Sequence, residues 1–135
     1  MKIPAIDSSG YKTPILVVED DPSIRHLVAD ALDHLGLTCH LAGNGREALD
    51  RLATTRYDIV ITDIQMPEMD GMELLRQIRP LYPAINVIAM TGYSTNYTAT
   101  DVIQAGACDF MAKPFTIKEM RAKLDRVFRN RSPDQ

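Results

Sequence analysis

Four short apolar runs of this 135-residue chain are each followed by a side chain that could take part in chemistry. The residues that follow the runs are Glu19-Asp20-Asp21, Asp63, Thr91 and Lys113. Carboxylates can bind a divalent cation or act as nucleophiles, and a lysine or a hydroxyl can contact phosphoryl oxygens. The combination indicates phosphoryl transfer, with Asp63 as the nucleophile and Lys113 and Thr91 as groups that contact the phosphoryl oxygens.

The acidic residues create an electrostatic problem that a bound cation would solve. If the carboxylates of Glu19, Asp20 and Asp63 lie together, each pair at about 4 Å repels by about 4 kcal/mol at an effective dielectric of about 20. Such a cluster needs a compensating cation, or one carboxyl must stay protonated. Oxygen-only ligands suit Mg²⁺, which we therefore expect as the cofactor, and Lys113 adds a second positive charge.

The order of apolar runs and amphipathic segments predicts the scaffold that brings these groups together. Apolar runs that indicate buried strands lie at residues 15–18, 39–42, 59–62, 87–90 and 110–112. Helix-length segments separate them, so the predicted fold is α/β, a doubly wound, parallel, five-stranded sheet with five helices. In such sheets ligands bind beyond the carboxyl ends of the strands, where polar residues far apart in sequence converge.

Capping residues mark the expected helix starts. Asp21-Pro22 places an acid at the N-cap and a proline at the first helical position. Capping-box patterns begin at Asn44, Asp70 and Thr116. Pro80 and Pro83 are expected to stop the third helix. The helix after the fourth strand is the weakest prediction, because residues 94–100 are rich in poor helix formers.

Several side chains outside the site carry simpler expectations. Leu27 continues the apolar stripe of the first helix and is expected to face the core. Cys39 and Cys108 read as small buried apolar residues, and Tyr57 as a half-buried aromatic residue. The histidines lack metal-ligand spacing and are expected at exposed polar positions; they are His26, His34 and His40.

Composition excludes several function classes. A net charge of −3 gives no basic surface for direct nucleic-acid binding. The two cysteines form no C-x-x-C pattern, which fits a reducing compartment. No apolar stretch is long enough for a membrane span, and residue Lys2 is not followed by a signal-peptide core. We therefore expect a cytoplasmic protein with a flexible N-terminal extension at 1–13, one domain at 14–130 and a C-terminal tail at 131–135.

The motifs resemble, in order, those of the receiver domain of two-component response regulators. The matching segments are residues 15–21, Asp63 to Gly71, Met90-Thr91-Gly92 and Ala105 to Phe115. The resemblance covers about residues 13 to 130. It implies the flavodoxin-like strand order 2-1-3-4-5, and a phosphorylation-dependent switch that receives a phosphoryl group from a histidine kinase or a phosphotransfer protein.

The resemblance also implies a role for each site residue. Asp63 is the phospho-acceptor, Asp20 binds Mg²⁺ directly, Glu19 contributes to the same acidic pocket, and the backbone carbonyl of Gln65 is a metal ligand. Thr91 and Lys113 contact the phosphoryl group, and the Lys113-Pro114 bond is cis.

Phe110 is implied as the aromatic switch residue whose rotamer follows Thr91. It stands where tyrosine is frequent and cannot donate a hydrogen bond, so a switch there must work by packing. Gln65 and Tyr93 lie at positions that tune the lifetime of the phosphoryl group.

The resemblance further implies an output surface on the fourth helix, fifth strand and fifth helix, read by a downstream protein or output domain. Candidate surface residues there are Asp101, Gln104, Asp109, Lys118, Arg121 and Lys123. A phosphorylation-driven homodimer stays open. Neither nucleic acid nor membrane is expected to contact this domain directly.

Three other readings compete with the switch. An Mg²⁺-dependent phosphatase with an aspartyl nucleophile needs a second acid two residues later, where Gln65 stands. A flavodoxin-like nucleotide binder needs a phosphate loop where Glu19, Asp20 and Asp21 would repel phosphate. A degenerate receiver would bind partners without phosphorylation. The switch reading predicts no enzyme beyond self-catalysed phosphorylation and autodephosphorylation.

Overall fold

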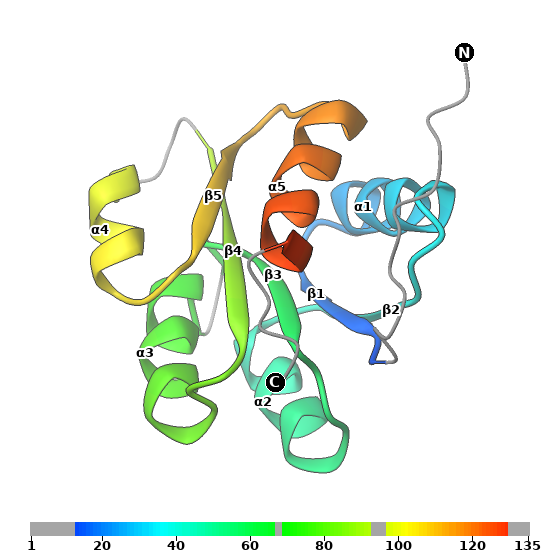
Figure 1. The fold of residues 1–135 in the computed structure, drawn as a ribbon. Helices are drawn as coiled ribbons and strands as arrows, with labels where there is room; N and C mark the ends of the chain where they lie inside the picture. Colours follow the sequence, from blue (N-terminus) through cyan, green and yellow to red (C-terminus); the bar gives the residue numbers. More distant parts are fainter. Residues whose placement is uncertain (1–12, 67–68, 93–96, 130–135) are drawn as a thin grey trace.

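The computed structural model describes residues 13–66, 69–92 and 97–129. Strands and helices alternate along the chain (Figure 1). They are β1 (Ile15–Val18), α1 (Pro22–His34), β2 (Cys39–Ala42), α2 (Gly45–Thr54), β3 (Ile59–Asp63), α3 (Gly71–Leu81), β4 (Asn86–Thr91), α4 (Ala99–Gln104), β5 (Asp109–Ala112) and α5 (Ile117–Arg129). The expectations for the extension, the tail and Tyr93 fall outside the described residues.

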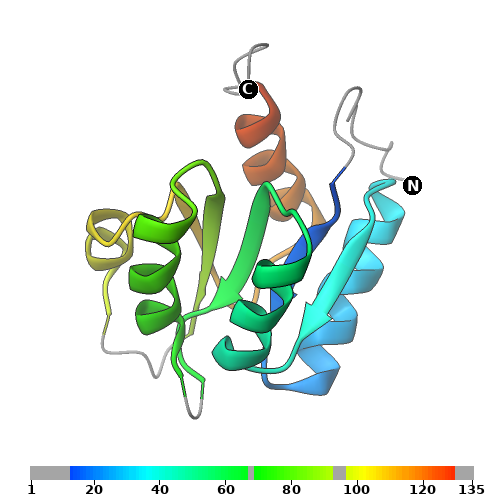
Figure 2. The same cartoon turned by 90° about the horizontal axis from the view of Figure 1, so that it is seen from below.

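All five strands are parallel and lie in the order β2-β1-β3-β4-β5, which confirms the predicted fold class and strand order. Helices α1 and α5 cover one face of the sheet, and α2, α3 and α4 cover the other (Figures 1 and 2). The register pairs Val18 with Thr62 and Thr91 with Ala112. The residues that follow these strands therefore meet at one edge of the sheet.

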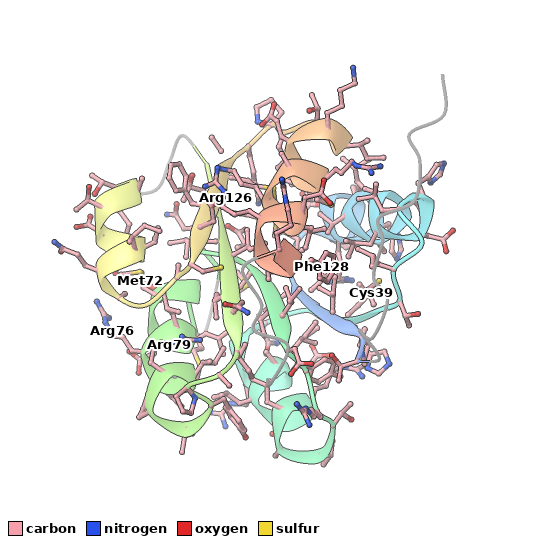
Figure 3. All side chains as sticks on the ribbon, viewed as in Figure 1. Cys39, Met72, Arg76, Arg79, Arg126 and Phe128 are labelled. Atoms are coloured by element: carbon pink, nitrogen blue, oxygen red, sulfur yellow. The ribbon has the colours of Figure 1, made fainter. Side chains whose placement is uncertain are left out.

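Successive strand residues point to opposite faces and supply two separate cores. Leu16, Val18 and Val60 pack under α2 and α3, whereas Ile15 and Val17 pack under α1 and α5. Side chains fill the space between the sheet and the helices on both faces (Figure 3). Strands buried on both faces are a rigid base for the polar residues at their ends.

Helix α1 starts as predicted, but its buried face is narrower than expected. Asp21 caps it by accepting hydrogen bonds from the backbone of Ser23 and Ile24. The prediction for Leu27 is wrong, since this side chain is 62% exposed. Leu27 lies at the flank of the stripe formed by Val28 and the other buried residues of α1. There it lines a shallow cavity of about 320 Å³ between α1 and the start of α5.

Helix α3 does not stop at Pro80, which lies inside it. Pro80 is exposed in the last turn, so its missing N–H removes one terminal hydrogen bond and leaves the chain helical for one more residue. The backbone N–H of Tyr82 then donates to the carbonyl of Ile78 at 2.7 Å and ends the helix.

Helix α4 exists despite its weak sequence signal. It has only six residues, and Thr98 and Asp101 form a reciprocal capping box at its start. Val102 is fully buried in the core under α4. Capping and one buried anchor therefore replace the helix propensity that the segment lacks.

Three smaller expectations also need correction. Cys108 is exposed and Cys39 half-buried, so neither is a fully buried apolar residue. Tyr57 is buried rather than half-buried, and its hydroxyl forms a hydrogen bond with Nδ1 of His40 at 2.6 Å, which satisfies its polar group. His40 is consequently half-buried, whereas His26 and His34 are exposed as expected.

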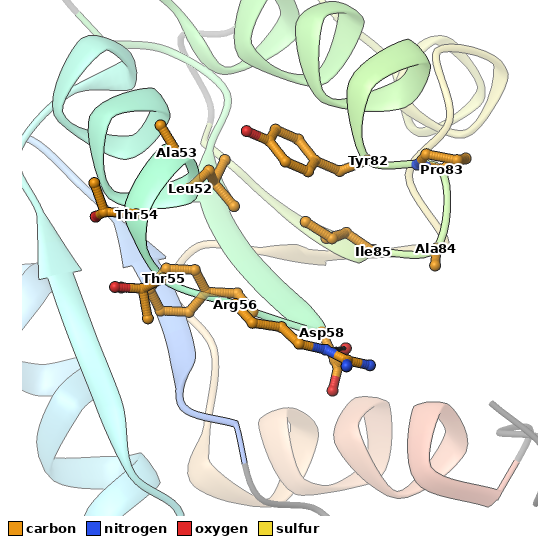
Figure 4. A pocket seen from close by; sticks show the side chains of 11 residues that line it. Leu52, Ala53, Thr54, Thr55, Arg56, Asp58, Tyr82, Pro83, Ala84 and Ile85 are labelled. Carbon is orange, nitrogen blue, oxygen red and sulfur yellow. Dashed lines mark ion pairs between the residues drawn. The ribbon is translucent and has the colours of Figure 1, made fainter.

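A cavity of about 490 Å³ lies at the amino-terminal edge of the sheet (Figure 4). It lies between the end of α2 with the following loop and the α3–β4 loop, and Tyr57, Tyr82 and Ile85 are among its lining residues. It contains none of the predicted site residues, which lie at the opposite edge. In the described ranges no helix is long and apolar enough to cross a bilayer.

Candidate functional site

The ends of β1 and β3 bring three carboxylates together. Glu19, Asp20 and Asp63 each offer an oxygen, and these oxygens lie within 4.8 Å of one another. Glu19 and Asp63 are buried, whereas Asp20 is exposed. The cluster is therefore a buried acidic pair that opens to solvent on one side.

Lys113 reaches the same point from the end of β5. Its Nζ donates to Oε1 of Glu19 at 2.6 Å and to Oδ2 of Asp63 at 2.9 Å. Both ion pairs lie in a poorly solvated place, since the side chains of Glu19 and Asp63 are only 1% and 8% exposed. The predicted convergence of residues 50 and 94 positions apart in sequence is thus present.

Burial and crowding shift two pKa values at the site. The pKa of Glu19 is raised to about 7; burial is the largest cause, the hydrogen bond with Lys113 opposes the rise, and the carboxyl of Asp63 adds to it. Burial lowers the pKa of Lys113, but its hydrogen bonds to Glu19 and Asp63 outweigh this, so that pKa is raised overall. Lys113 therefore stays charged while Glu19 can hold a proton near neutral pH.

The backbone around Asp63 is fixed by the start of α3. The N–H of Gly71 donates to the carbonyl of Ile64 at 2.8 Å. A Cβ at Gly71 would lie 2.0 Å from the carbonyl oxygen of Asp63, so only glycine permits this approach. The N–H of Gln65 also donates to Oδ1 of Asp63 at 3.2 Å. Both oxygens of the Asp63 carboxylate are thus oriented.

Thr91 and Phe110 take no part in the ion pairs of the site. The Thr91 hydroxyl donates to the carbonyl of Met111 at 3.4 Å, a long and weak bond. Phe110 is half-buried against the core under α4, and Nζ of Lys123 lies 5.4 Å from its ring centroid. The Lys113-Pro114 bond is cis, as the resemblance implied.

Asp109 is not exposed, in contrast to the expectation for the output surface. Asp109 is only 6% exposed, because Lys123 and Arg126 of α5 pair with its carboxylate at 3.0 and 3.2 Å. The prediction of Asp109 as a surface residue is therefore wrong. The two ion pairs of its carboxylate connect β5 to α5.

One contributor to the site, Arg25 of α1, is missing from the sequence prediction. Its Nη1 donates to the backbone carbonyl of Glu19 at 2.9 Å. The only sequence signal is its position six residues after Glu19, on the first turns of the helix that Asp21 caps. Nothing in the residue type separates such an arginine from a solvated surface charge.

The donor set fits a hard divalent cation. Three carboxylates face one ammonium group within the cluster, which leaves an excess of negative charge. Carboxylate oxygens with one open, solvated side match the preference of Mg²⁺ for a few protein oxygens and several waters. The residues present can therefore hold Mg²⁺.

A doubly wound parallel sheet with an acidic cluster and a lysine at its carboxyl edge defines a class of phosphoryl-handling α/β domains. The family model of the response regulator receiver domain matches residues 15–125, and the chain belongs to this family. Receiver domains are signalling switches rather than enzymes in the usual sense, and phosphorylation and Mg²⁺ binding are general properties of the family.

Curated relatives agree with this assignment. The DNA-binding transcriptional regulator NtrC of Escherichia coli strain K12 is 43% identical over 113 residues, which cover 84% of this chain and 24% of that protein. The response regulator MprA of Mycolicibacterium vanbaalenii is 36% identical over 120 residues, or 89% of this chain and 52% of that protein. The chain thus spans between a quarter and about half of these relatives.

Solved structures show the same fold. The receiver domain of NtrX from Brucella abortus superposes with a TM-score of 0.81 at 31% identity, covering 87% of this chain and 99% of that chain. The chemotaxis protein CheY4 of Vibrio cholerae gives a TM-score of 0.78 at 30% identity, covering 85% and 98%.

Proposed function

We propose that this domain accepts a phosphoryl group on Asp63 from a histidine kinase or a phosphotransfer protein, and that the change is read by a partner or an output domain. The observation that carries the proposal is the double ion pair of Lys113 with Glu19 and Asp63. It places a fixed ammonium group beside a buried carboxylate at the carboxyl edge of the sheet, where open parallel α/β sheets bind their ligands.

The transfer needs few groups. A carboxylate oxygen of Asp63 forms a bond to phosphorus while the bond from phosphorus to the donor breaks, and the donor leaves with that electron pair. Lys113 already donates to Oδ2 of Asp63, so its ammonium group would shift its hydrogen bond to a phosphoryl oxygen and stabilise the negative charge there. Thr91 would give up its weak bond to Met111 and donate its hydroxyl to a phosphoryl oxygen.

Bound Mg²⁺ would neutralise charge on the phosphoryl oxygens. Glu19, Asp20 and Asp63 would hold it with the backbone carbonyl of Gln65. Glu19 and Asp63 are positioned by Lys113 and by backbone N–H groups, whereas Asp20 faces solvent. The arrangement would bind the cation and orient the phosphoryl group.

Readout is proposed to pass through Phe110. Its ring lies between the core under α4 and Lys123 of α5, so a change in its packing would reach both helices. The output surface would then be α4, β5 and α5, with the exposed Gln104 and Lys118 as candidates and a homodimer or an output domain as reader.

Relatives suggest the wider context. NtrC is named a DNA-binding transcriptional regulator and is about four times longer than the matched region. We infer a domain at residues 14–130 that works in the cytoplasm and controls an output module, without itself binding nucleic acid. A phosphatase is the poorer proposal, because Gln65 cannot replace the second acid that such enzymes use.

The test is phosphorylation by a small acyl phosphate in the presence of Mg²⁺, followed by intact-mass measurement. The proposal predicts one phosphoryl adduct on the wild type, no adduct in EDTA and none on Asp63→Asn. Asp50→Asn is the matched control, because Asp50 is an exposed aspartate on α2. A wild type that stays unmodified would favour a degenerate receiver, and continuous turnover of a phosphomonoester would revive the phosphatase.

A further inference from the structure

We propose that Arg25 is a positioning residue for the metal site and sets its affinity for Mg²⁺ by holding the Glu19–Asp20 peptide. The inference rests on the proposed Mg²⁺-dependent function and adds a residue to it. Arg25 is half-buried on α1, and its guanidinium donates to the carbonyl oxygen of Glu19 at 2.9 Å. A hydrogen bond from a charged donor is stronger than one between neutral groups.

Every polar group of Glu19 has a partner. Its N–H donates to the carbonyl of Ala42 at 3.1 Å, Oε1 accepts from Lys113, and Oε2 accepts from the N–H of Asp21 at 3.3 Å. Its own carbonyl accepts from Arg25. Removal of Arg25 would leave that carbonyl without this partner and free the peptide to rotate.

Asp20 depends on this peptide more than Glu19 does. Within the ranges that the structure describes, no hydrogen bond or ion pair involves the Asp20 carboxylate, and its side chain is exposed. Its position is therefore fixed through its backbone, whose preceding peptide carries the carbonyl that Arg25 holds. Partners one step removed from a metal ligand commonly change metal affinity by about 10- to 100-fold.

Arg25 also lies against the neighbouring loop. Its Nη1 is 3.3 Å from the place where a Cβ at Gly43 would lie. The Gly43 N–H in turn donates to Oε2 of Glu47 on α2 at 3.1 Å. The guanidinium thus packs between the loop that carries the acids and the start of α2, which keeps its direction fixed.

The charge of Arg25 by itself predicts the opposite effect from the proposed role. A cation near a Mg²⁺ site repels the metal, so loss of the charge alone would tighten binding. Loss of a positioning contact would weaken it. The sign of the change therefore separates the two roles.

The experiment is calorimetric titration of the whole chain with MgCl₂. Arg25→Met and Arg25→Gln cannot reach the carbonyl and are expected to raise the Kd for Mg²⁺ about tenfold, whereas Arg25→Lys keeps a charged donor and recovers part of the affinity. Arg46→Met is the matched control, since it removes an exposed arginine from the first turn of α2 and should change the Kd less than twofold.

A second readout is the Mg²⁺ dependence of acyl-phosphate labelling. Arg25→Met should need about tenfold more Mg²⁺ for half-maximal rate and reach the wild-type rate at saturation, which a general folding defect would not produce. An unchanged or lower Kd in Arg25→Met, or in Arg25→Gln if the first variant does not fold, overturns the role of Arg25. A wild type that binds no Mg²⁺ overturns the proposed function instead.

Discussion

The carboxylate of Glu19 is fully buried beside Asp63, and burial is the main reason why its pKa is raised to about 7. The same side chain is a proposed ligand of Mg²⁺. A proton and the cation therefore compete for it near neutral pH. This competition belongs to a single residue and gives the site a measurable pH dependence.

We predict that Mg²⁺ affinity falls as the pH is lowered below about 7. Glu19 is protonated in the metal-free protein below its raised pKa, so binding must release that proton, and the Kd should rise by up to about tenfold per pH unit. Titrations between pH 5.5 and 8 check this. Glu19→Gln should bind more weakly with a flatter pH profile; equal slopes in both proteins would contradict the assignment.

Lys113 balances the two buried acids, so its removal should destabilise the metal-free protein. For Lys113→Met we expect a loss of about 2–4 kcal/mol in the free energy of unfolding in EDTA, because two buried carboxylates lose their cation. A carboxyl whose pKa is raised on folding costs stability once the pH exceeds its unfolded pKa. The loss should therefore be larger at pH 8 than at pH 6.

Urea unfolding at both pH values, with and without MgCl₂, measures this effect. Lys118→Met serves as control, because Lys118 is an exposed lysine on the first turn of α5. Recovery of stability on adding Mg²⁺ is expected for Lys113→Met. Equal stability of the two variants in EDTA would mean that the buried ion pairs do not hold the acids in place.

At the scale of elements, Asp63 keeps its place because α3 starts against its backbone. A Cβ at Gly71 would overlap the Asp63 carbonyl, whereas one at Gly92 would meet nothing within 4 Å. We expect Gly71→Ala to lower the free energy of unfolding by about 2–4 kcal/mol and Gly92→Ala to change it little. Thermal or urea unfolding of both variants checks this, and similar losses would contradict the packing argument.

The elements that sequence reasoning predicted are those with strong local signals. The buried strands and the cap at Asp21 follow from hydrophobic runs and helix-start chemistry. The sequence signal for helix α4 is weak, because the helix depends on the packing of Val102 in the core, which a local sequence pattern does not reveal. Pro80 was misread because one lost hydrogen bond in an exposed last turn is tolerated.

The same contrast holds for the candidate site. The convergence of Glu19, Asp63 and Lys113 was predictable, because parallel strands bring their carboxyl ends to one edge. Arg25 was not predictable, since its role depends on a backbone carbonyl rather than on its own residue type. Asp109 was misplaced because its partners come from α5, fourteen and seventeen positions later.

At the scale of the whole molecule, the domain is a sheet with a separate core on each face and a polar site at one edge. Strands β1 and β3 are buried on both sides and pair along their length, so they form a stiff support. Phe110 and Asp109 of β5 both contact Lys123 of α5, Phe110 through its ring and Asp109 through an ion pair. Lys113, which directly follows β5, contacts Asp63, so the proposed phosphorylation would act on the strand that carries Phe110 and Asp109.

The most direct test of the account is to locate the phosphoryl group on the chain. After labelling with an acyl phosphate and Mg²⁺, borohydride reduces an aspartyl phosphate to homoserine, and tandem mass spectrometry of peptides finds the altered residue. Homoserine is expected at position 63 alone, and it should be absent in Asp63→Asn and in EDTA. Reduction at another carboxylate such as Asp20, or at none, would contradict it.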